Sequence, residues 1–398
     1  MKLDVNWQAA FNIIHSLEKA GYEAVIVGGA VRDYLRGHLA NDVDIATSAL
    51  PEEVKTVFSR TADVGIAHGT VLVIHPLSPV EVTTYRTEGS YADHRRPDDV
   101  QFVRSLEEDL KRRDFTINAM AMRASKEIVD LYGGQSDLKA QLIRAVGNAS
   151  DRFAEDALRM LRAIRFSAQL GFAIEEETFK AIRKQAADLS YIAKERIKAE
   201  FDKIWTSANA KEAIYYVNDT QLVDYLPVEF SGNANAWSNF ESRGNPMNGW
   251  AFLILLQRDE NALQLLKAFN CSNKEKVYVQ QVLQAYKRRI TPGWTARDYF
   301  EFDLPVLEIA NDFAEKLNRN IGNLNSSEIP HKKKLLTIQS RTEIAVNGRD
   351  LMEWSGKKSG PWLKVVIDKM VDEILSNKLV NERQHIKEWF SHESNIEK

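Results

Sequence analysis

The sequence is poor in the features that mark secreted and membrane-embedded proteins. One cysteine, Cys271, in 398 residues excludes a disulfide framework and a multi-cysteine zinc site, and it suits a reducing cytoplasm. The longest apolar run, residues 250–256, is far shorter than the roughly 20 residues that cross a bilayer. We therefore expect a cytoplasmic protein that does not enter a membrane, and we interpret its acid-bearing N-terminal segment as an amphipathic helix rather than a signal peptide.

An excess of charge of one sign is also lacking. The 53 Lys and Arg residues face 56 Asp and Glu residues, for a formal charge of -3. This balance excludes a protein held along its whole length on nucleic acid by charge alone, so any such contact must be local. A local excess lies in residues 274–298, where six cations face two acids; it fits either phosphate contacts or a solvated helix face. The six cations are Lys274, Lys276, Lys287, Arg288, Arg289 and Arg297.

The residues that are present favour a large, multidomain globular protein. Hydrophobic residues make up 44% of the chain, and its length predicts two or three domains. The first 130 or so residues mix helical and strand patterns, including a predicted hairpin of residues 70–75 and 79–86. After Gly147 helical patterns dominate, with helices expected at 151–172, 176–187 and 193–206. The fold class that we predict is α+β, with a mixed β-sheet in an N-terminal head and an all-α remainder.

The first candidate for chemistry is a strand that runs into two glycines and then a helix. Residues 24–27 are the strand, and GGAVRDYLRG follows at 28–37. Such a turn presents backbone N–H groups at a positive helix end, which suits a phosphate, and Arg32 could add a charge-assisted contact. An ordinary strand–turn–helix connection explains the same pattern.

Two aspartates follow in the stretch DVDIAT, at positions 42 and 44. In a strand their carboxylates project from one face, and like charges so close together are tolerated mainly around a cation. Hard oxygen ligands favour Mg²⁺, which takes its other ligands from water and substrate phosphates. An edge strand with two surface acids is the alternative. Glu81 is a candidate third carboxylate, although a plain exposed glutamate fits equally well.

Two further stretches carry grouped charges. Three cations at 111–113 could neutralise a triphosphate or form a solvated helix end. On the helix predicted at 151–172, Asp156, Arg159 and Arg162 recur every three residues and share a face. An Asp that accepts from an exocyclic amine beside an Arg that donates to the ring would admit C and A and reject U and G. Surface i,i+3 ion pairs explain the same spacing.

Together these motifs resemble the bacterial CCA-adding enzymes, class II tRNA nucleotidyltransferases of the polymerase-β-like superfamily. The resemblance spans roughly residues 22–205. It rests on the stretches GGAVRD, DVDIAT, TEGSYADHRRPDDVQF, RRDFTINAMA, EDALRMLRAIRF and ERIKAEF.

The resemblance implies a head (1–150), a neck (151–210), a body (211–320) and a tail (321–398), with body and tail assigned by position. It implies stepwise addition of C, C and A to tRNA 3′ ends from CTP and ATP, with Mg²⁺. The implied partners are tRNA, through its acceptor arm and 3′ end, and the two nucleotides, and the chain would be a monomer or homodimer. The implied site residues are Asp42 and Asp44 as catalytic metal ligands, and Gly29, Arg32, Arg113, Asp156, Arg159, Arg162 and Arg165 at the nucleotide.

Other activities stay open at this point. The related poly(A) polymerases carry an arginine-rich strand soon after the two aspartates, whereas RTADVGIAHGTVLVI stands here. Enzymes that add only CC lack a flexible loop that residues 87–99 resemble, and an A-adding enzyme is a further possibility. An RNA-binding module with a degenerate head is disfavoured, because it has no need for clustered carboxylates near RNA phosphates.

Overall fold

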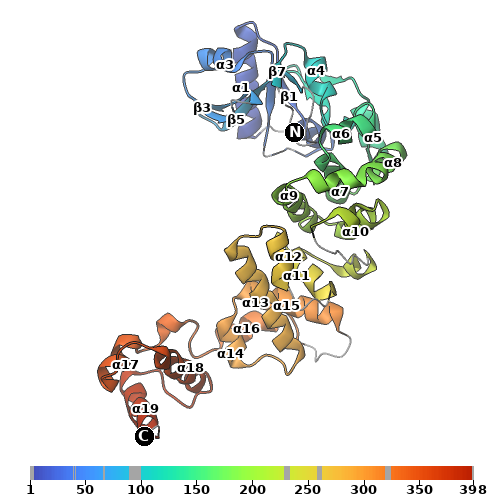
Figure 1. The fold of residues 1–398 in the computed structure, drawn as a ribbon. Coiled ribbons are helices and arrows are strands. Elements are labelled where there is room, and N and C mark those ends of the chain that lie inside the picture. The colour runs from blue at the N-terminus through green and yellow to red at the C-terminus, as the bar shows by residue number, and fades with distance from the viewer. Residues whose placement is uncertain are drawn as a thin grey trace. The chain divides into compact units, whose positions relative to one another are not determined.

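The computed structural model describes residues 4–38, 40, 42–65, 68–88, 100–227, 234–257, 262–318 and 324–396. The chain forms two compact units, one within Met1–Gly249 and Glu260–Asn270, the other within Trp250–Asp259 and Cys271–Lys398 (Figure 1). The helices between residues 149 and 219 belong to the same unit as the N-terminal sheet, and the finer division into four parts stays a prediction. Most of the loop predicted at 87–99 lies outside the described residues; its first two, Thr87 and Glu88, belong to a strand.

A seven-stranded sheet forms the core of the first unit, in the order β3-β4-β5-β2-β1-β8-β9. The β2–β5 pair is parallel and the other pairs are antiparallel, so the sheet is mixed, as predicted. The predicted hairpin is confirmed as β4 and β5. The strands are β1 (Ala24–Val27), β2 (Ile45–Thr47), β3 (Thr61–Gly65), β4 (Thr70–Ile74), β5 (Pro79–Thr84), β8 (Met120–Met122) and β9 (Ile128–Asp130).

Two short strand pairs accompany this sheet. The first joins β6 (Arg86–Glu88) and β7 (Val100–Phe102) in antiparallel pairing, and the second joins β10 (Leu142–Ile143) and β11 (Ala173–Ile174) in parallel pairing. The β6–β7 pair therefore brackets the segment 89–99.

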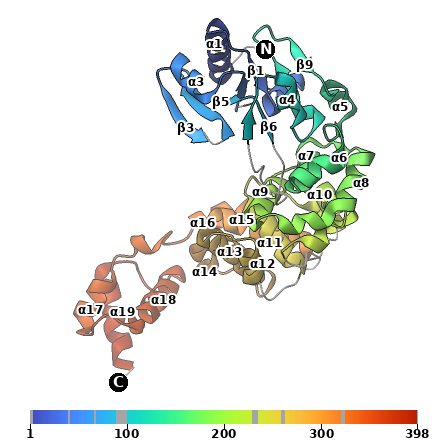
Figure 2. The ribbon, with the colours of Figure 1, turned by 45° about the horizontal axis from the view of Figure 1, so that its top comes forward.

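Both faces of the sheet are covered because its strands alternate two apolar sets. Ile26 and Val82 face a core that includes α1 (Val5–Lys19) and α3 (Pro51–Val57), which lie beside the strands in Figure 2. Val25 and Val27 point the other way and pack with Leu106 and Leu110 of α4 (Leu106–Lys111). Because successive residues of a strand point to opposite faces, each strand contributes to both cores, and polar groups lie at the strand ends.

Further helices of the first unit lie between and after the strands in the chain. The helix predicted over 151–172 is in fact two, because Asp156 is extended (φ -142°, ψ 102°) and its carboxylate accepts from the Leu158 backbone N–H at 3.1 Å. Asp side chains that bond nearby backbone groups interrupt helices in this way. These helices are α2 (Gly29–Leu35), α5 (Gly134–Ala140), α6 (Ala149–Glu155), α7 (Leu158–Leu170), α8 (Glu176–Gln185), α9 (Lys194–Trp205) and α10 (Ala210–Asp219).

The C-terminal part of the chain is helical, so the predicted helical remainder is confirmed apart from the short strand β11. In the second unit, Met370, Val371 and Ile374 of α18 form a separate apolar core with Ile386 of α19. The helices are α11 (Pro246–Gln257), α12 (Ala262–Ala268), α13 (Asn273–Ile290), α14 (Ala296–Glu301), α15 (Leu304–Leu317), α16 (Glu328–Lys334), α17 (Gly348–Ser355), α18 (Pro361–Leu375) and α19 (Arg383–Ile396). Within the described parts of the chain, no helix is both long and apolar enough to span a membrane.

Candidate active site

The turn between β1 and α2 brings two predicted arginines together. Gly28 has φ +70°, a conformation that favours glycine, and a Cβ there would lie 3.1 Å from Arg113 Nη1. A Cβ on Gly29 would lie 3.6 Å from Arg32 Nη2. The absence of side chains at both glycines therefore leaves space in front of two guanidinium groups.

The predicted carboxylates lie beside this turn. Asp42 and Asp44 are exposed and flank the buried Val43, so the predicted alternation is confirmed although β2 begins only at Ile45. The Asp44 carbonyl accepts from the Val27 N–H at 3.1 Å, which fixes Asp44 at the end of β1. Because Ile45 pairs with Val82 in the parallel ladder, Asp44 is level with Glu81 on the neighbouring strand.

These carboxylates affect one another electrostatically. The pKa of Asp44 is raised, first because surrounding protein atoms displace part of its hydration and next because of the Glu81 carboxylate. Asp42 raises that pKa further, whereas Arg113 lowers it. The structure thus brings Asp42, Glu81 and Arg113 close enough to affect the charge of Asp44, which supports Glu81 as the candidate third carboxylate.

These acids suit a divalent cation. Carboxylate oxygens are hard ligands, and a cation between repelling carboxylates relieves the repulsion that raises the pKa of Asp44. Among the residues placed in the structure, no three His, Cys, Asp or Glu side chains are gathered closely enough to hold a metal by themselves.

Arg113 is held in place by an acid that the sequence reasoning missed. Asp109 of α4, almost fully buried, accepts from Arg113 Nη2 at 3.0 Å and from Arg112 Nη2 at 2.7 Å. Burial opposes ionisation of Asp109, but the two guanidinium groups outweigh it and hold its pKa below the usual range. Arg113 Nη1 faces the glycine turn and has no acceptor among the described residues, so it remains available to an anion, whereas Nε is buried.

The residues predicted on one helix face have different surroundings. Asp156 lies between α6 and α7, so the prediction that it shares a helix face with Arg159 and Arg162 is wrong. Its carboxylate accepts from Arg196 of α9, at 2.7 Å from Nη2 and 3.3 Å from Nη1. Arg159 is 8% exposed and donates to Glu155 and to the Arg112 carbonyl.

The two remaining predicted arginines also have acidic partners. Arg162 Nε and Nη2 donate to Asp114 at 2.8 and 2.6 Å. Burial disfavours ionisation of Asp114, but Arg162 overrides it and the pKa of Asp114 is lowered. Arg165 is 6% exposed; its Nε lies 2.5 Å from Glu200 and its Nη1 donates to Gln169 at 2.7 Å. Arg165 thus resembles a buried structural residue more than a contact for a ligand.

The sequence reasoning named the candidate site residues but not the residues that pair with them. Arg196 and Glu200 lie in the stretch ERIKAEF and Asp114 in RRDFTINAMA, both already singled out. The usable signal was the presence of unassigned acids and cations in these two stretches. Which residue pairs with which depends on contacts between segments 35 to 48 residues apart, and spacing does not show them.

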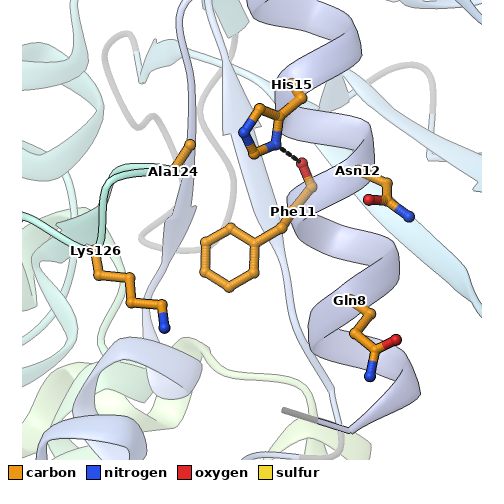
Figure 3. Close-up of a pocket in the computed structure, with 6 residues that line it drawn as sticks. All are labelled: Gln8, Phe11, Asn12, His15, Ala124 and Lys126. Carbon is orange, nitrogen blue, oxygen red and sulfur yellow. Dashed lines mark hydrogen bonds between the residues drawn. The ribbon is translucent and has the colours of Figure 1, made fainter. Parts of the chain in front are cut away.

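Two cavities of the first unit are lined by other residues than these. One of about 590 Å³ adjoins α2 and α5, and its lining includes Arg36 and Lys139. Another, of about 290 Å³, lies between α1 and the β8–β9 turn, with the Phe11 ring and the Lys126 side chain on facing elements (Figure 3).

Family models match most of the chain. One described as "Poly A polymerase head domain" matches residues 24–144, and "Probable RNA and SrmB- binding site of polymerase A" matches 171–229. A third, "tRNA nucleotidyltransferase domain 2 putative", matches 245–390. The first of these contains the glycine turn, the carboxylates and Arg113.

Individual proteins match over nearly their whole length. A CCA-adding enzyme of Bacillus cytotoxicus is 42% identical over 95% of this chain and 96% of its own. The solved Bacillus stearothermophilus CCA-adding enzyme, in complex with CTP, is 36% identical with a TM-score of 0.88, covering 100% of this chain and 99% of that one. The Thermotoga maritima enzyme complexed with tRNA shares the fold, with a TM-score of 0.62 at 18% identity over 97% and 95% of the two chains. With the charged groups of its head placed as described, this chain belongs to the CCA-adding enzymes, which are tRNA nucleotidyltransferases.

Proposed function

We propose that this chain adds C, C and A stepwise to the 3′ end of tRNA, taking CTP and ATP as substrates and releasing pyrophosphate. Asp42 and Asp44 are the catalytic metal ligands and bind Mg²⁺, and Glu81 is the third carboxylate. Gly29, Arg32 and Arg113 face the nucleotide. The observation that carries the proposal is the grouping of Asp42, Asp44, Glu81 and Arg113 around one turn.

Each head residue has a distinct task in this proposal. Bound Mg²⁺ supplies activation of the tRNA 3′-hydroxyl and neutralisation of the triphosphate. Asp42 and Asp44 hold their carboxylates on one side of Val43 and so give the ion two anchors from one segment. Arg113, fixed by Asp109, points its available N–H groups at the glycine turn, where phosphate oxygens would lie.

The neck residues would choose the base. A carboxylate offers about four lone-pair positions, so Asp156 can accept from an exocyclic amine while it still binds Arg196. Arg162 uses Nε and Nη2 for Asp114, and its Nη1 donates to no residue in the described part of the chain. Arg159 adds positive charge beside them, and Arg165 enters the proposal as a buried support for this group.

The remaining features of the proposal concern partners and location. The C-terminal helices would hold the acceptor arm of tRNA, the protein would act in the cytoplasm as a monomer or homodimer, and no membrane would be involved. The single buried Cys271 suits that reducing compartment.

The test uses purified full-length protein, tRNA that lacks its CCA end, and single labelled nucleotides with Mg²⁺. CTP alone should add two residues, and ATP should then add one. Addition of A alone, of CC without A, or of long A tails would replace the proposal with an A-adding, CC-adding or poly(A)-polymerase activity. If the protein binds the tRNA but adds no nucleotide to it, the enzymatic proposal is wrong altogether.

A further inference from the structure

One aromatic ring in α7 is surrounded by three arginines. The guanidinium carbons of Arg32 and Arg162 each lie 5.5 Å from the centroid of the Phe166 ring, and that of Arg165 lies 3.7 Å from it. Phe115 approaches the same ring edge-on, at 5.7 Å and 79°. Arg32 belongs to α2, whereas Arg162 and Arg165 belong to α7, so residues more than 130 positions apart in the chain meet at Phe166.

The ring is not needed to neutralise these charges. Arg32 donates to Asp33 at 2.9 Å and to Asn118 at 2.8 Å, and Arg162 has Asp114. Arg165 has Glu200. What the ring adds is a negative π surface within the range of about 6 Å at which guanidinium groups are attracted.

Arg165 lies closer to the ring than the other two arginines do. It stacks closely on the ring and is tied to Glu200, so it fixes the ring itself. The Arg162 side chain is 32% exposed, whereas that of Arg32, at 11%, is nearly as buried as that of Arg165, at 7%. Long arginine side chains lose rotamer freedom when they bind a ligand, and a surface that already orients them reduces that loss.

We propose that Phe166 is a positioning residue for nucleotide binding: its ring orients the guanidinium groups of Arg32 and Arg162 before CTP or ATP arrives. The inference rests on the proposed function, which assigns both arginines to the incoming nucleotide. A purely structural Phe166 would fill space in the neck and leave nucleotide binding unchanged once the protein is folded.

The sharpest test keeps the shape of the ring and changes its electrostatics. Phenylalanines with one to five fluorine atoms, incorporated at position 166 of the full-length chain, progressively weaken the negative face at almost constant size. The KM for CTP and for ATP should rise stepwise with fluorine number, to roughly 5- to 30-fold for two weakened cation–π contacts, while kcat changes less than about threefold. The same series at Phe153, a fully buried ring in α6, is the matched control and should leave KM constant.

A second measurement links the effect to its partner. In an Arg162→Met background the fluorine dependence of KM should be about half as steep, because one of the two oriented guanidinium groups is gone. Phe166→Leu should raise KM as the fluorinated series does. Phe166→Tyr, which keeps an aromatic ring, should retain most of the wild-type affinity for the nucleotide.

The outcomes separate the two proposals. A wild-type chain that fails to add CCA, or an Arg162→Met variant with unchanged KM, contradicts the proposed function and its nucleotide contacts. Normal addition by the wild type, together with a KM that is flat across the fluorinated series or a slope that ignores Arg162→Met, overturns the role of Phe166 alone.

Discussion

Two groups of acids in the first unit have opposite electrostatic surroundings. In the head, Asp42 and Asp44 are exposed beside another acid, and the pKa of Asp44 is raised. By contrast, Asp114 and Asp156 each bind an arginine of α7 or α9, and the pKa of Asp114 is lowered. Acids that repel one another favour the binding of a cation, whereas acids that are already paired hold the side chains of their partners in place. A loss of charge should therefore impair chemistry at the Asp42–Asp44 group and stability or selectivity at the paired acids.

The largest effect is expected from Asp44→Asn in the head. Loss of one metal ligand removes transition-state stabilisation of several kcal/mol, so nucleotide incorporation should fall by about 1,000-fold or more. Thermal stability without Mg²⁺ should be unchanged or slightly higher, because a repelling charge is removed. Single-turnover incorporation and melting curves with and without Mg²⁺ measure both effects.

Asp63→Asn is the matched control for that change, since Asp63 is an exposed acid of the same sheet that pairs with Lys55. It should retain normal turnover. An Asp44→Asn variant that incorporates nucleotides at the wild-type rate, or that binds tRNA much more weakly, would remove Asp44 from the metal site.

The next largest effect is expected from Asp114→Asn, which leaves Arg162 without its counter-ion. Breaking a buried ion pair from one side costs about 3 kcal/mol at the lower end of the usual range, and Arg162 is partly exposed, so we expect that lower end. Denaturant unfolding followed by a probe in the first unit measures it. Asp151→Asn, at an exposed position on α6, is the control and should change stability by less than about 0.5 kcal/mol.

The same pair predicts a dependence on pH. Because the folded-state pKa of Asp114 lies below the ordinary value, its contribution is complete above about pH 4 and is lost as the pH falls through that lowered pKa. The stability difference between wild type and Asp114→Asn should therefore be constant near neutrality and shrink in acid. A difference that grows toward acid would mean that Asp114 is not the ionised partner of Arg162.

A smaller, more specific effect is expected from Asp156→Ala. If this carboxylate accepts from the exocyclic amine of C or A, its loss relaxes selectivity, and discrimination against UTP and GTP should fall by about 10- to 100-fold. The kcat/KM values for all four nucleotides measure it. Unaltered ratios with lower thermal stability would reduce Asp156 to a structural partner of Arg196.

How much of this could be predicted from the sequence depends on the range of the interaction. The strand at 24–27, the hairpin of β4 and β5 and the Asp–Val–Asp alternation are local patterns, and the structure confirms them. The single helix at 151–172 was wrong, because the Asp156 carboxylate competes for a backbone N–H and periodicity does not register that competition.

The candidate site shows the same limit. The stretches that hold its residues were visible in the sequence, but Glu81 could be related to Asp44 only through the parallel register of β2 and β5. The pairs Asp114–Arg162 and Arg165–Glu200 join residues 48 and 35 positions apart. Such pairings depend on how helices and strands pack, and spacing along one element carries no information about them.

The smallest effect concerns the cations at 274–298, predicted from composition as a phosphate-binding patch or a solvated face. The structure divides them. Arg289 is buried against Asn311, and Arg297 donates to Glu301 and Asp368. Arg288 likewise binds two acids, Asp298 and Glu301. Two of these arginines are paired with acids and the third is buried, so they stabilise the second unit and are poorly placed to contact RNA.

The lysines of the same stretch are different. Lys274 and Lys287 are exposed on α13, and neither has an acidic partner among the described residues. If they contact tRNA phosphates, replacing both by Gln should lower the slope of log K against log salt by about 0.9 for each contact on duplex RNA, while Arg297→Gln should leave the slope unchanged and lower stability instead. Binding titrations at four salt concentrations decide between the two uses of charge. A slope that responds to Arg297 and not to the lysines would mean that the arginines paired with acids also contact the nucleic acid.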